Sequence, residues 1–291
     1  PPSLPDIRHL KQEGVQMKKL VLFGLASLRA PSLTYCRRNR TSLACFLAAV
    51  FLALSPMCST GLWAQPGTSS LFLWAWERRE DLSFIDPHRI GVAYLAGTVY
   101  LRGTEVEVRP RLQPLRLPDG TNVIAVVRVE RHNAVLSADQ CGRCAAEIMG
   151  FLPLQRIRSL QIDFDASVSE RPFYAALLSG LRSRLPKSCG LSMTALASWC
   201  TWDDWLSDLP VEAAVPMLFR MGRDRDSVIR SLQENGCFRA EKCRGSVGIS
   251  TDEPVPYLPP CEKVFVFNPH PWSSTELYRA TEEVKRWREK H

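Results

Sequence analysis

The sequence has 291 residues, of which 45% are hydrophobic and 23% charged, and its formal net charge is +7. This length and composition suffice for one large folded domain or two small ones. The excess positive charge lies at the start of the chain, because residues 1–65 contain eight Lys and Arg against two acidic residues, whereas the remainder contains 29 against 28. Since the rest of the chain is nearly neutral, we exclude nucleic acid as a partner.

Residues 1–64 are predicted to be a leader that contains a signal peptide. The hydrophobic run of residues 43–54 follows a basic cluster at residues 37–40, and small and polar residues come after it. This run suits the core of a signal peptide and is shorter than the roughly 20 residues needed to span a bilayer. We expect cleavage after Gly61 or Ala64, which would give a periplasmic or secreted protein.

Two alternatives to a cleaved leader stay open. The apolar run could remain as an uncleaved anchor, or Cys58 could carry a lipid, although Met57 stands where a lipoprotein signal needs a small residue. In both alternatives the protein contacts a membrane only through its leader.

Seven cysteines follow the leader, and export would make them candidates for disulfide bonds. Their odd number leaves one thiol unpaired or paired between chains. Cys141 and Cys144 form a CGRC motif that could be a redox pair or half of a zinc site, but no second pair follows at zinc-ligand spacing, which favours a surface pair on a helix with at most a local disulfide. The histidines His88, His132 and His270 share no ligand spacing either. We therefore predict neither a metal nor a cofactor.

From residue 70 onward, hydrophobic runs rich in β-forming residues alternate with longer polar or helical segments. The eight runs are 71–76, 89–101, 122–129, 158–165, 191–199, 213–221, 245–250 and 263–268. Helices are expected at 134–152, 169–185, 224–233 and 273–290. Alternating strands and helices predict an α/β protein with parallel pairing, and eight such units match one TIM-like (β/α)₈ barrel over residues 70–291.

Two features bear on this assignment. The second run continues into residues 104–110, which predicts an extra hairpin after the second strand. A doubly wound open sheet is the alternative fold, but no glycine-rich phosphate-binding loop follows the first run.

Polar and aromatic residues gather at the ends of the predicted strands, where TIM barrels carry their sites. Aromatic faces beside polar groups suit a sugar ring, which offers C–H groups on its flat side and hydroxyls at its rim. We therefore predict a carbohydrate-binding cleft formed by Trp74, Trp76, Glu77, Arg128, Trp199, Asp252, Asn268 and Trp272. In the alternative interpretation each Trp only caps the core, and Arg128 pairs with Glu130 or Asp163.

The stretch LQIDFDAS at residues 160–167 alternates like a β-strand and places Asp163 and Asp165 on one face. Residues two apart on a strand lie about 6.6 Å from each other, so one ionised carboxylate should raise the pKa of the other. A proton holder beside an anion is what glycoside cleavage requires. The structural alternative is a network in which Asp165 caps the next helix and Asp163 pairs with Arg128.

The IDFD pattern of residues 162–165, together with LSMTALASW at residues 191–199, resembles the bacterial proteins grouped as domain of unknown function 3142. Members of this family carry a similar Asp-aromatic-Asp on the fourth strand and a Thr-Ala-Leu segment after it. The resemblance covers most of residues 71–272 and implies a barrel, but it assigns no activity.

The same strand is more distantly similar to the chitinase-type barrel motif, Asp-x-x-Asp-x-Asp-x-Glu. Its second and third acids fall on Asp163 and Asp165, whereas Leu160 stands at the first position and Ser167 at the position of the catalytic Glu. A serine cannot protonate a leaving group as a carboxylic acid does. The acid must then come from another strand, and we predict Glu253.

The sequence therefore predicts an exported, glycoside-hydrolase-like barrel that acts on or binds carbohydrate. In the catalytic form, Asp163 or Asp165 steers a nucleophile or water, while Glu253 or the other aspartate protonates the leaving oxygen. The alternative is a non-catalytic carbohydrate-binding or scaffolding barrel of the cell envelope.

Overall fold

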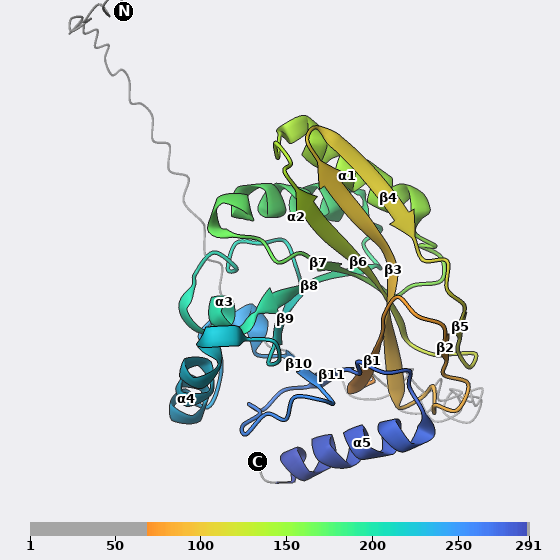
Figure 1. Ribbon diagram of the computed structural model, residues 1–291, viewed down its shortest axis with the longest axis vertical. Coiled ribbons are helices and arrows are strands. Elements are labelled where there is room, and N and C mark those ends of the chain that lie inside the picture. Colours follow the sequence, from red (N-terminus) through yellow and green to blue (C-terminus); the bar gives the residue numbers. More distant parts are fainter. Residues whose placement is uncertain (1–68, 290–291) are drawn as a thin grey trace, which may run out of the picture. The chain divides into compact units, whose positions relative to one another are not determined.

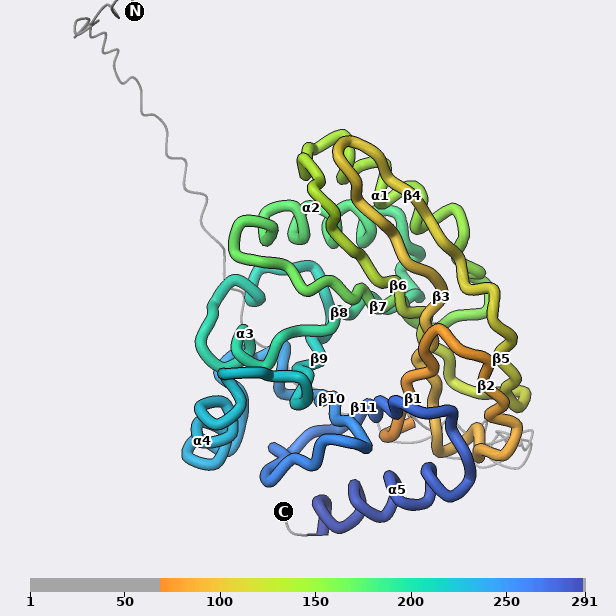
Figure 2. Tube along the Cα trace, viewed as in Figure 1, coloured from red at the N-terminus to blue at the C-terminus, as the bar shows by residue number. Residues whose placement is uncertain are grey.

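A computed structural model describes residues 69–289, so the predicted leader lies outside the described residues. Within them, eight parallel strands pair in a closed ring (Figures 1 and 2). They are β1 (Leu71–Ala75), β3 (Ile90–Arg102), β6 (Val123–His132), β7 (Ser159–Asp163), β8 (Gly190–Leu196), β9 (Ala213–Met217), β10 (Ser246–Ser250) and β11 (Lys263–Phe267). Strand β1 pairs with both β3 and β11, which closes the ring. The predicted barrel of eight parallel strands is confirmed.

Helices lie around the outside of the ring (Figure 1). The α-helices are α1 (Ala138–Phe151), α2 (Arg171–Arg184), α3 (Ala197–Trp202), α4 (Arg225–Asn235) and α5 (Ser274–Arg288). They follow β6, β7, β8, β9 and β11, so in the described residues β1, β3 and β10 lead into loops or short elements instead. The 3₁₀ turns are Val168–Glu170, Gly222–Asp224 and Glu241–Cys243. No helix among residues 69–289 is long and apolar enough to cross a membrane.

Some predicted strands are too long. The run 213–221 is a strand only as far as Met217, and the run 191–199 divides into β8 and the start of α3. The chain is still extended at Leu196, which caps α3. Hydrophobicity alone cannot separate a buried strand from a buried helical turn, and this run contains both.

Additional strands lie outside the ring. Strand β3 turns at Gly103, which has a φ of 53°, and β4 (Glu105–Pro110) returns antiparallel to it. The short strands β2 (Glu80–Asp81) and β5 (Leu115–Arg116) form a separate parallel pair. These additional strands lie outside the ring, on the side of β1 and β3.

The side chains of β7 alternate between the two faces of the barrel wall, as predicted. Gln161 accepts a hydrogen bond from Nε1 of Trp74 (3.1 Å), and since β1 and β7 are not neighbours in the ring, this bond crosses the interior. Ile162 and Phe164 are buried on the outer side, where Tyr174 of α2 donates to the carbonyl of Ile162 (3.0 Å) and packs edge-on against Phe164.

The barrel interior is filled by its own apolar cluster, separate from the larger core between strands and helices. Its buried members are Phe72, Trp74, Ala93, Ile124, Val126, Val215 and Phe265. Trp74 fits because Gly248 stands across from it, where a Cβ would lie 2.6 Å from the indole. Because side chains fill the barrel interior, a ligand-binding site is expected at the strand ends.

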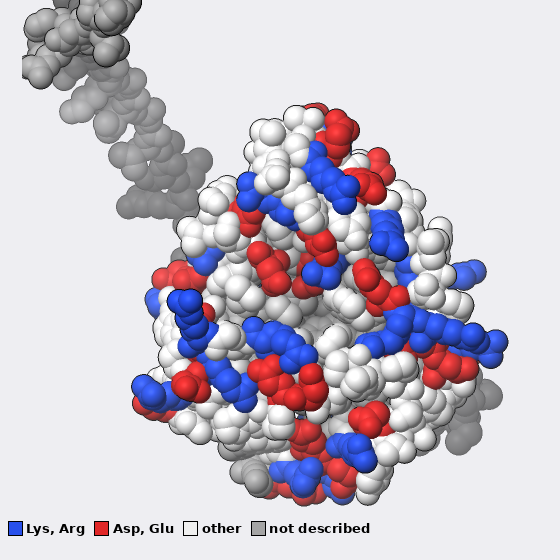
Figure 3. Space-filling model, viewed as in Figure 1, with Lys and Arg blue, Asp and Glu red and all other residues white. Residues whose placement is uncertain are grey.

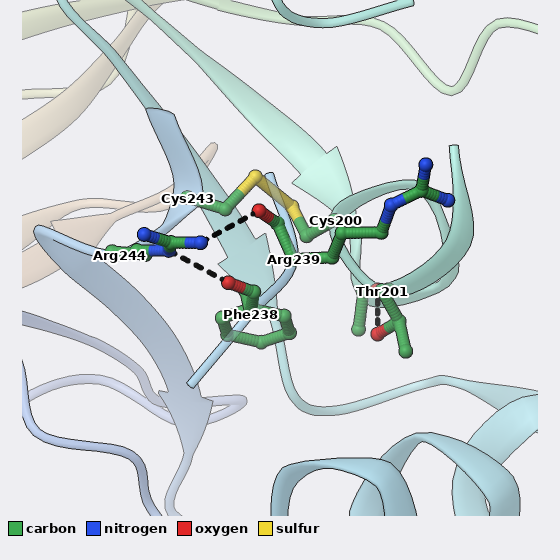
Figure 4. Close-up of a disulfide and its surroundings, with 7 residues drawn as sticks. Cys200, Thr201, Phe238, Arg239, Cys243 and Arg244 are labelled. Carbon is green, nitrogen blue, oxygen red and sulfur yellow. Dashed lines mark hydrogen bonds between the residues drawn. A yellow bond between two sulfur atoms is a disulfide. The ribbon is translucent and has the colours of Figure 1, made fainter. Parts of the chain in front are cut away.

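A disulfide between Cys200 of α3 and Cys243 fastens the 3₁₀ turn at residues 241–243 to the barrel (Figure 4). Beside it, Arg244 donates to the carbonyls of Phe238 (2.9 Å) and Arg239 (3.0 Å). The bond joins residues 43 apart in the sequence, so it restricts a long loop of the unfolded chain.

We expect the Cys200→Ala/Cys243→Ala double variant to be less stable by about 2–4 kcal/mol, because its unfolded chain gains freedom. Urea unfolding with and without a thiol reductant measures this. The control is Cys237→Ala, which removes a half-buried free thiol. If reductant leaves the wild-type midpoint unchanged, the bond does not stabilise the fold.

Candidate functional site

A cavity of about 280 Å³ opens at the C-terminal ends of the strands. In the view of Figure 1, the face of the barrel turned to the reader is hollowed near its centre, with acidic and basic side chains around the hollow (Figure 3). The cavity is lined by Trp74, Trp76, Arg128, Asp163, Asp165, Thr194, Leu196, Met217, Phe219, Arg220 and Phe267. It brings together five residues predicted from sequence: Trp74, Trp76, Arg128, Asp163 and Asp165.

Asp163 is the half-buried carboxyl group of this cavity. Burial raises its pKa to about 6, and the negative charge of Asp165 acts in the same direction. The hydroxyl of Thr194 donates to its Oδ1 (2.7 Å) and opposes the rise, as does the charge of Arg128. A carboxyl group with this pKa holds a proton part of the time near neutral pH, which suits acid–base chemistry.

Asp165 lies two residues beyond Asp163, past the end of β7, and is exposed at the mouth of the cavity. Desolvation by the surrounding protein raises its pKa, and Arg128 partly offsets this effect. The guanidinium of Arg128 itself pairs with Glu130 (3.2 Å), not with Asp163. The pair of aspartates is therefore not neutralised by a direct ion pair, which disfavours the structural network considered above.

An aromatic wall faces the aspartates. Phe267 of β11, which lies across the ring from β7, stacks on Phe219 with centroids 5.7 Å apart and planes 2° apart. Trp76 meets the edge of Phe267 (6.3 Å), and the buried Trp74 contacts Phe219 (6.0 Å) beneath them. Flat aromatic surface on one side and carboxyl groups on the other form the kind of pocket expected for a sugar ring.

Three predicted binding residues are buried outside this cavity. Trp199 belongs to α3 and packs against Trp205 (5.1 Å). Trp272 donates through Nε1 to the carbonyl of Trp74 (3.0 Å), and Asn268 accepts from the hydroxyl of Thr251 (2.7 Å). These contacts favour the structural interpretation, in which such residues support the strand ends without reaching a ligand.

Glu77, Asp252 and Glu253 also lie outside the cavity lining. Glu77 is exposed beside Thr98, whose hydroxyl is 3.5 Å from its Oε1. Asp252 forms an ion pair with Arg220 (2.7 Å) and accepts from Ser250. Asp252 therefore reaches the cavity only through Arg220, whereas Glu77 lines a separate small cavity beside β3 and β4.

Glu253 holds Arg220, a cavity residue whose φ of 55° is unusual for a residue with a side chain. Oε2 of Glu253 accepts from the backbone amide of Arg220 (2.9 Å) and from its guanidinium (2.8 Å), and Oε1 accepts from Arg225 (2.8 Å). Burial alone would raise the pKa of Glu253, but these donors outweigh it and lower the pKa. A carboxylate that is ionised and accepts three hydrogen bonds is a poor proton donor. This geometry therefore does not support Glu253 as the acid.

We expect Glu253→Gln to lower stability by about 0.5–1.5 kcal/mol, because it weakens two partly exposed ion pairs and leaves Arg220 less firmly held. Urea unfolding measures the change in stability, and an assay of carbohydrate binding and hydrolysis measures the effect on function. Asp252→Asn is the matched control, since it weakens one ion pair of Arg220 and leaves both ion pairs of Glu253 in place. If Glu253→Gln abolishes hydrolysis but leaves stability unchanged, Glu253 is again the candidate for the acid.

The cavity also contains Arg220, a strand-end residue without an assigned role, and residues that the sequence analysis did not select, namely Thr194, Leu196, Met217, Phe219 and Phe267. Three of them continue the two-residue period of inward-facing positions: Met217 and Phe219 follow Val215, and Phe267 follows Phe265. That period, applied from each buried strand outward, would have found them.

Metal chemistry has no candidate ligand set in the described part of the chain. Within residues 69–289, no three or more His, Cys, Asp or Glu side chains are grouped so that they could hold a metal ion.

The closed ring and its strand-end cavity define an α/β barrel protein with a candidate ligand pocket. Residues 119–212 match the family model described as Domain of unknown function (DUF3142). This segment runs from β6 through α3 and includes Asp163 and Thr194. The resemblance predicted from the IDFD and Thr-Ala-Leu segments is confirmed over these residues.

The solved structure of the Bacillus cereus spore cortex-lytic enzyme SleL is similar at 15% identity, with a TM-score of 0.39. The similarity covers 63% of this chain and 52% of that one, so the chain spans about half the length of SleL. The fold described above follows from the strand pairing and not from this distant likeness. No curated protein matches the sequence.

Proposed function

We propose that this chain is an exported, glycoside-hydrolase-like barrel that takes carbohydrate into the strand-end cavity. The observation that carries the proposal is the placement of Asp163, with its pKa raised to about 6, beside Asp165 and opposite the wall of Trp76, Phe219 and Phe267. Aromatic rings bind the flat side of a sugar while the carboxyl groups reach its oxygens.

In the catalytic form, Asp163 is the proton holder and Asp165 the anion. Asp163 gives its proton to the glycosidic oxygen as the bond from that oxygen to the anomeric carbon breaks. A water oxygen then bonds to the anomeric carbon, and the proton it loses passes to the carboxylate of Asp165. Thr194 orients Asp163 by donating to Oδ1, which leaves Oδ2 free to carry the proton.

A non-catalytic binding barrel is the second candidate, and one observation favours it. Ser167, at the position of the catalytic Glu in chitinase-type barrels, takes no such role here: its backbone amide donates to Glu170 (2.6 Å) at the start of the turn into α2. Glu253 is held in ion pairs as well. A barrel with this arrangement could retain a sugar pocket without cleaving its ligand.

A panel of polysaccharides separates the two candidates. Release of new reducing ends from a member of the panel supports hydrolysis, whereas a calorimetric binding signal without release supports the binding barrel. The matched control is the Trp76→Ala variant, which removes one face of the aromatic wall. The proposal fails if the wild-type protein neither binds nor cleaves any member, or if Trp76→Ala handles the same glycan equally well.

Export rests on the leader and is supported by the Cys200–Cys243 disulfide, since such bonds persist in oxidising compartments. We expect cleavage between Gly61 and Gln65, because the apolar run at residues 43–54 is too short to span a bilayer. N-terminal sequencing of the protein recovered from the cell envelope or medium checks this. A mature chain that retains residues 43–54 would contradict cleavage and favour the anchored form.

A further inference from the structure

A second, larger cavity lies at the opposite end of the barrel, where the strands begin. Its volume is about 780 Å³. Its lining comes from the starts of β1, β6, β7 and β11 and from the loops that precede β3, β6, β7 and β8. Strands β7 and β11 stand across the ring from each other, so the cavity spans the bottom mouth of the barrel.

The floor of this cavity separates it from the candidate site. Phe72 and Ile124 are buried members of the interior cluster, and Phe72 stacks on Phe265 with centroids 4.9 Å apart. Trp74 fills the next layer above them. A ligand in the bottom cavity therefore cannot reach Asp163, and the two sites are independent.

The charges that line the bottom cavity are all positive. Arg156, Arg158 and Lys263 contribute them, and no Asp or Glu is part of the lining. All three side chains are exposed, and none has an ion pair within residues 69–289. The chain after the leader carries 29 basic and 28 acidic residues, so the positive lining is a local feature and does not reflect the overall charge.

Folding does not require this arrangement. Like charges gathered in one concave surface repel each other, and low-dielectric walls strengthen the field between them. The N-terminal face of a TIM barrel ordinarily serves stability, and three unpaired cations contribute nothing to it. An anion in the cavity would relieve the repulsion and use the planar guanidinium groups, which suit phosphate oxygens.

We propose that the bottom cavity binds a phosphate-bearing group. Three cations match a phosphate monoester, which carries close to two negative charges, better than a single carboxylate. His88 and the hydroxyl of Ser188 line the same cavity and add polar groups at its rim.

The same chemistry could come from a soluble phosphate ester or from a phospholipid headgroup. The described chain begins at this end of the barrel, because Ser70 leads into β1 and its carbonyl accepts from the amide of Val264 (2.9 Å), the neighbour of Lys263. A leader that stays uncleaved would hold the protein at a membrane, where headgroup phosphates lie. A cleaved protein would meet soluble esters instead.

The test uses the full chain at low ionic strength. Binding of inorganic phosphate and of glycerol phosphate is measured by calorimetry against chloride at equal ionic strength. Co-sedimentation is measured with vesicles of phosphatidylcholine alone and of phosphatidylcholine with phosphatidic acid, whose headgroup is a phosphate monoester. The Arg156→Gln/Arg158→Gln double variant removes two cations of the cavity, and Arg223→Gln/Arg230→Gln is its control, with equal charge lost from exposed positions elsewhere.

We expect at least a tenfold loss of affinity in the cavity variant and less than a twofold change in the control. Because all four arginines are exposed, both variants should fold with wild-type melting temperatures. Binding to soluble phosphate identifies an ester ligand, and binding to the anionic vesicles alone identifies a headgroup; either result supports the proposal. It is overturned if neither probe binds better than chloride or neutral vesicles, or if both variants lose binding equally.

Discussion

Asp163→Asn is expected to stabilise the protein at neutral pH and to abolish the proposed binding or cleavage of carbohydrate. Burial raises the pKa of Asp163 to about 6, so keeping this group ionised above that pH costs free energy in the folded state. A neutral amide of the same shape removes the cost and still accepts the hydrogen bond from Thr194. Since Asp163 is only half-buried, we expect a gain of about 1–3 kcal/mol at pH 7.

The direction of the predicted change in stability follows from how the protonation of Asp163 depends on pH. Between the unfolded value of 3.8 and about 6, folded Asp163 holds a proton that the unfolded chain has lost. Wild-type stability therefore falls as pH rises through this window, and the full penalty is present above about pH 7. The raised pKa of Asp165 acts in the same direction. In the Asn variant the contribution of Asp163 disappears, so the two curves should meet near pH 4 and separate towards pH 7.

Urea unfolding from about pH 4 to pH 8, beside the glycan assays, measures both effects. Asp208→Asn is the matched control, because it removes an exposed carboxylate that does not line the cavity. The opposite result, a loss of stability at pH 7 with carbohydrate handling intact, would mean that Asp163 serves the fold. A structural carboxylate of that kind would leave buried partners unpaired when removed.

The ring of strands could be predicted from the sequence because each strand carries its own local signal. A run of β-forming apolar residues bounded by polar segments marks each of the eight, and the alternation of Gln161, Asp163 and Asp165 with Ile162 and Phe164 fixed which side chains face inward. Five of the cavity residues followed from the rule that sites lie at strand ends.

The remaining assignments depend on contacts between distant segments, which no local pattern encodes. Whether Trp272 reaches a ligand depends on the position of its indole, which bonds to the carbonyl of Trp74, 198 residues earlier. The role of Glu253 likewise depends on Arg220 and Arg225, which approach it from another strand-end loop. A carboxylate in a loop looks the same in sequence whether it is free to donate a proton or held between two guanidinium groups.

Trp74 and Trp76 give the clearest comparison, because they lie two residues apart but should have different roles. Trp74 belongs to β1, and Trp76 lies just past its end. Trp74 is 3% exposed and fills the barrel interior, so Trp74→Ala should lower stability by about 3–5 kcal/mol. Trp76 is half-buried on the wall of the cavity, so Trp76→Ala should cost under about 1 kcal/mol while weakening glycan binding at least tenfold.

Trp74→Phe refines this comparison, because it keeps an aromatic ring and removes only the indole N–H. Gln161 would then lose the donor to its Oε1, while its buried Nε2 has no hydrogen-bond partner within the described residues. Leaving such an amide unpaired should cost about 1–3 kcal/mol, measured by urea unfolding. The Trp74→Phe/Gln161→Leu double variant should recover most of that loss, because it removes the unpaired polar group together with its donor. If the double variant is no more stable than Trp74→Phe alone, the bond across the barrel is not what fixes Trp74 in place.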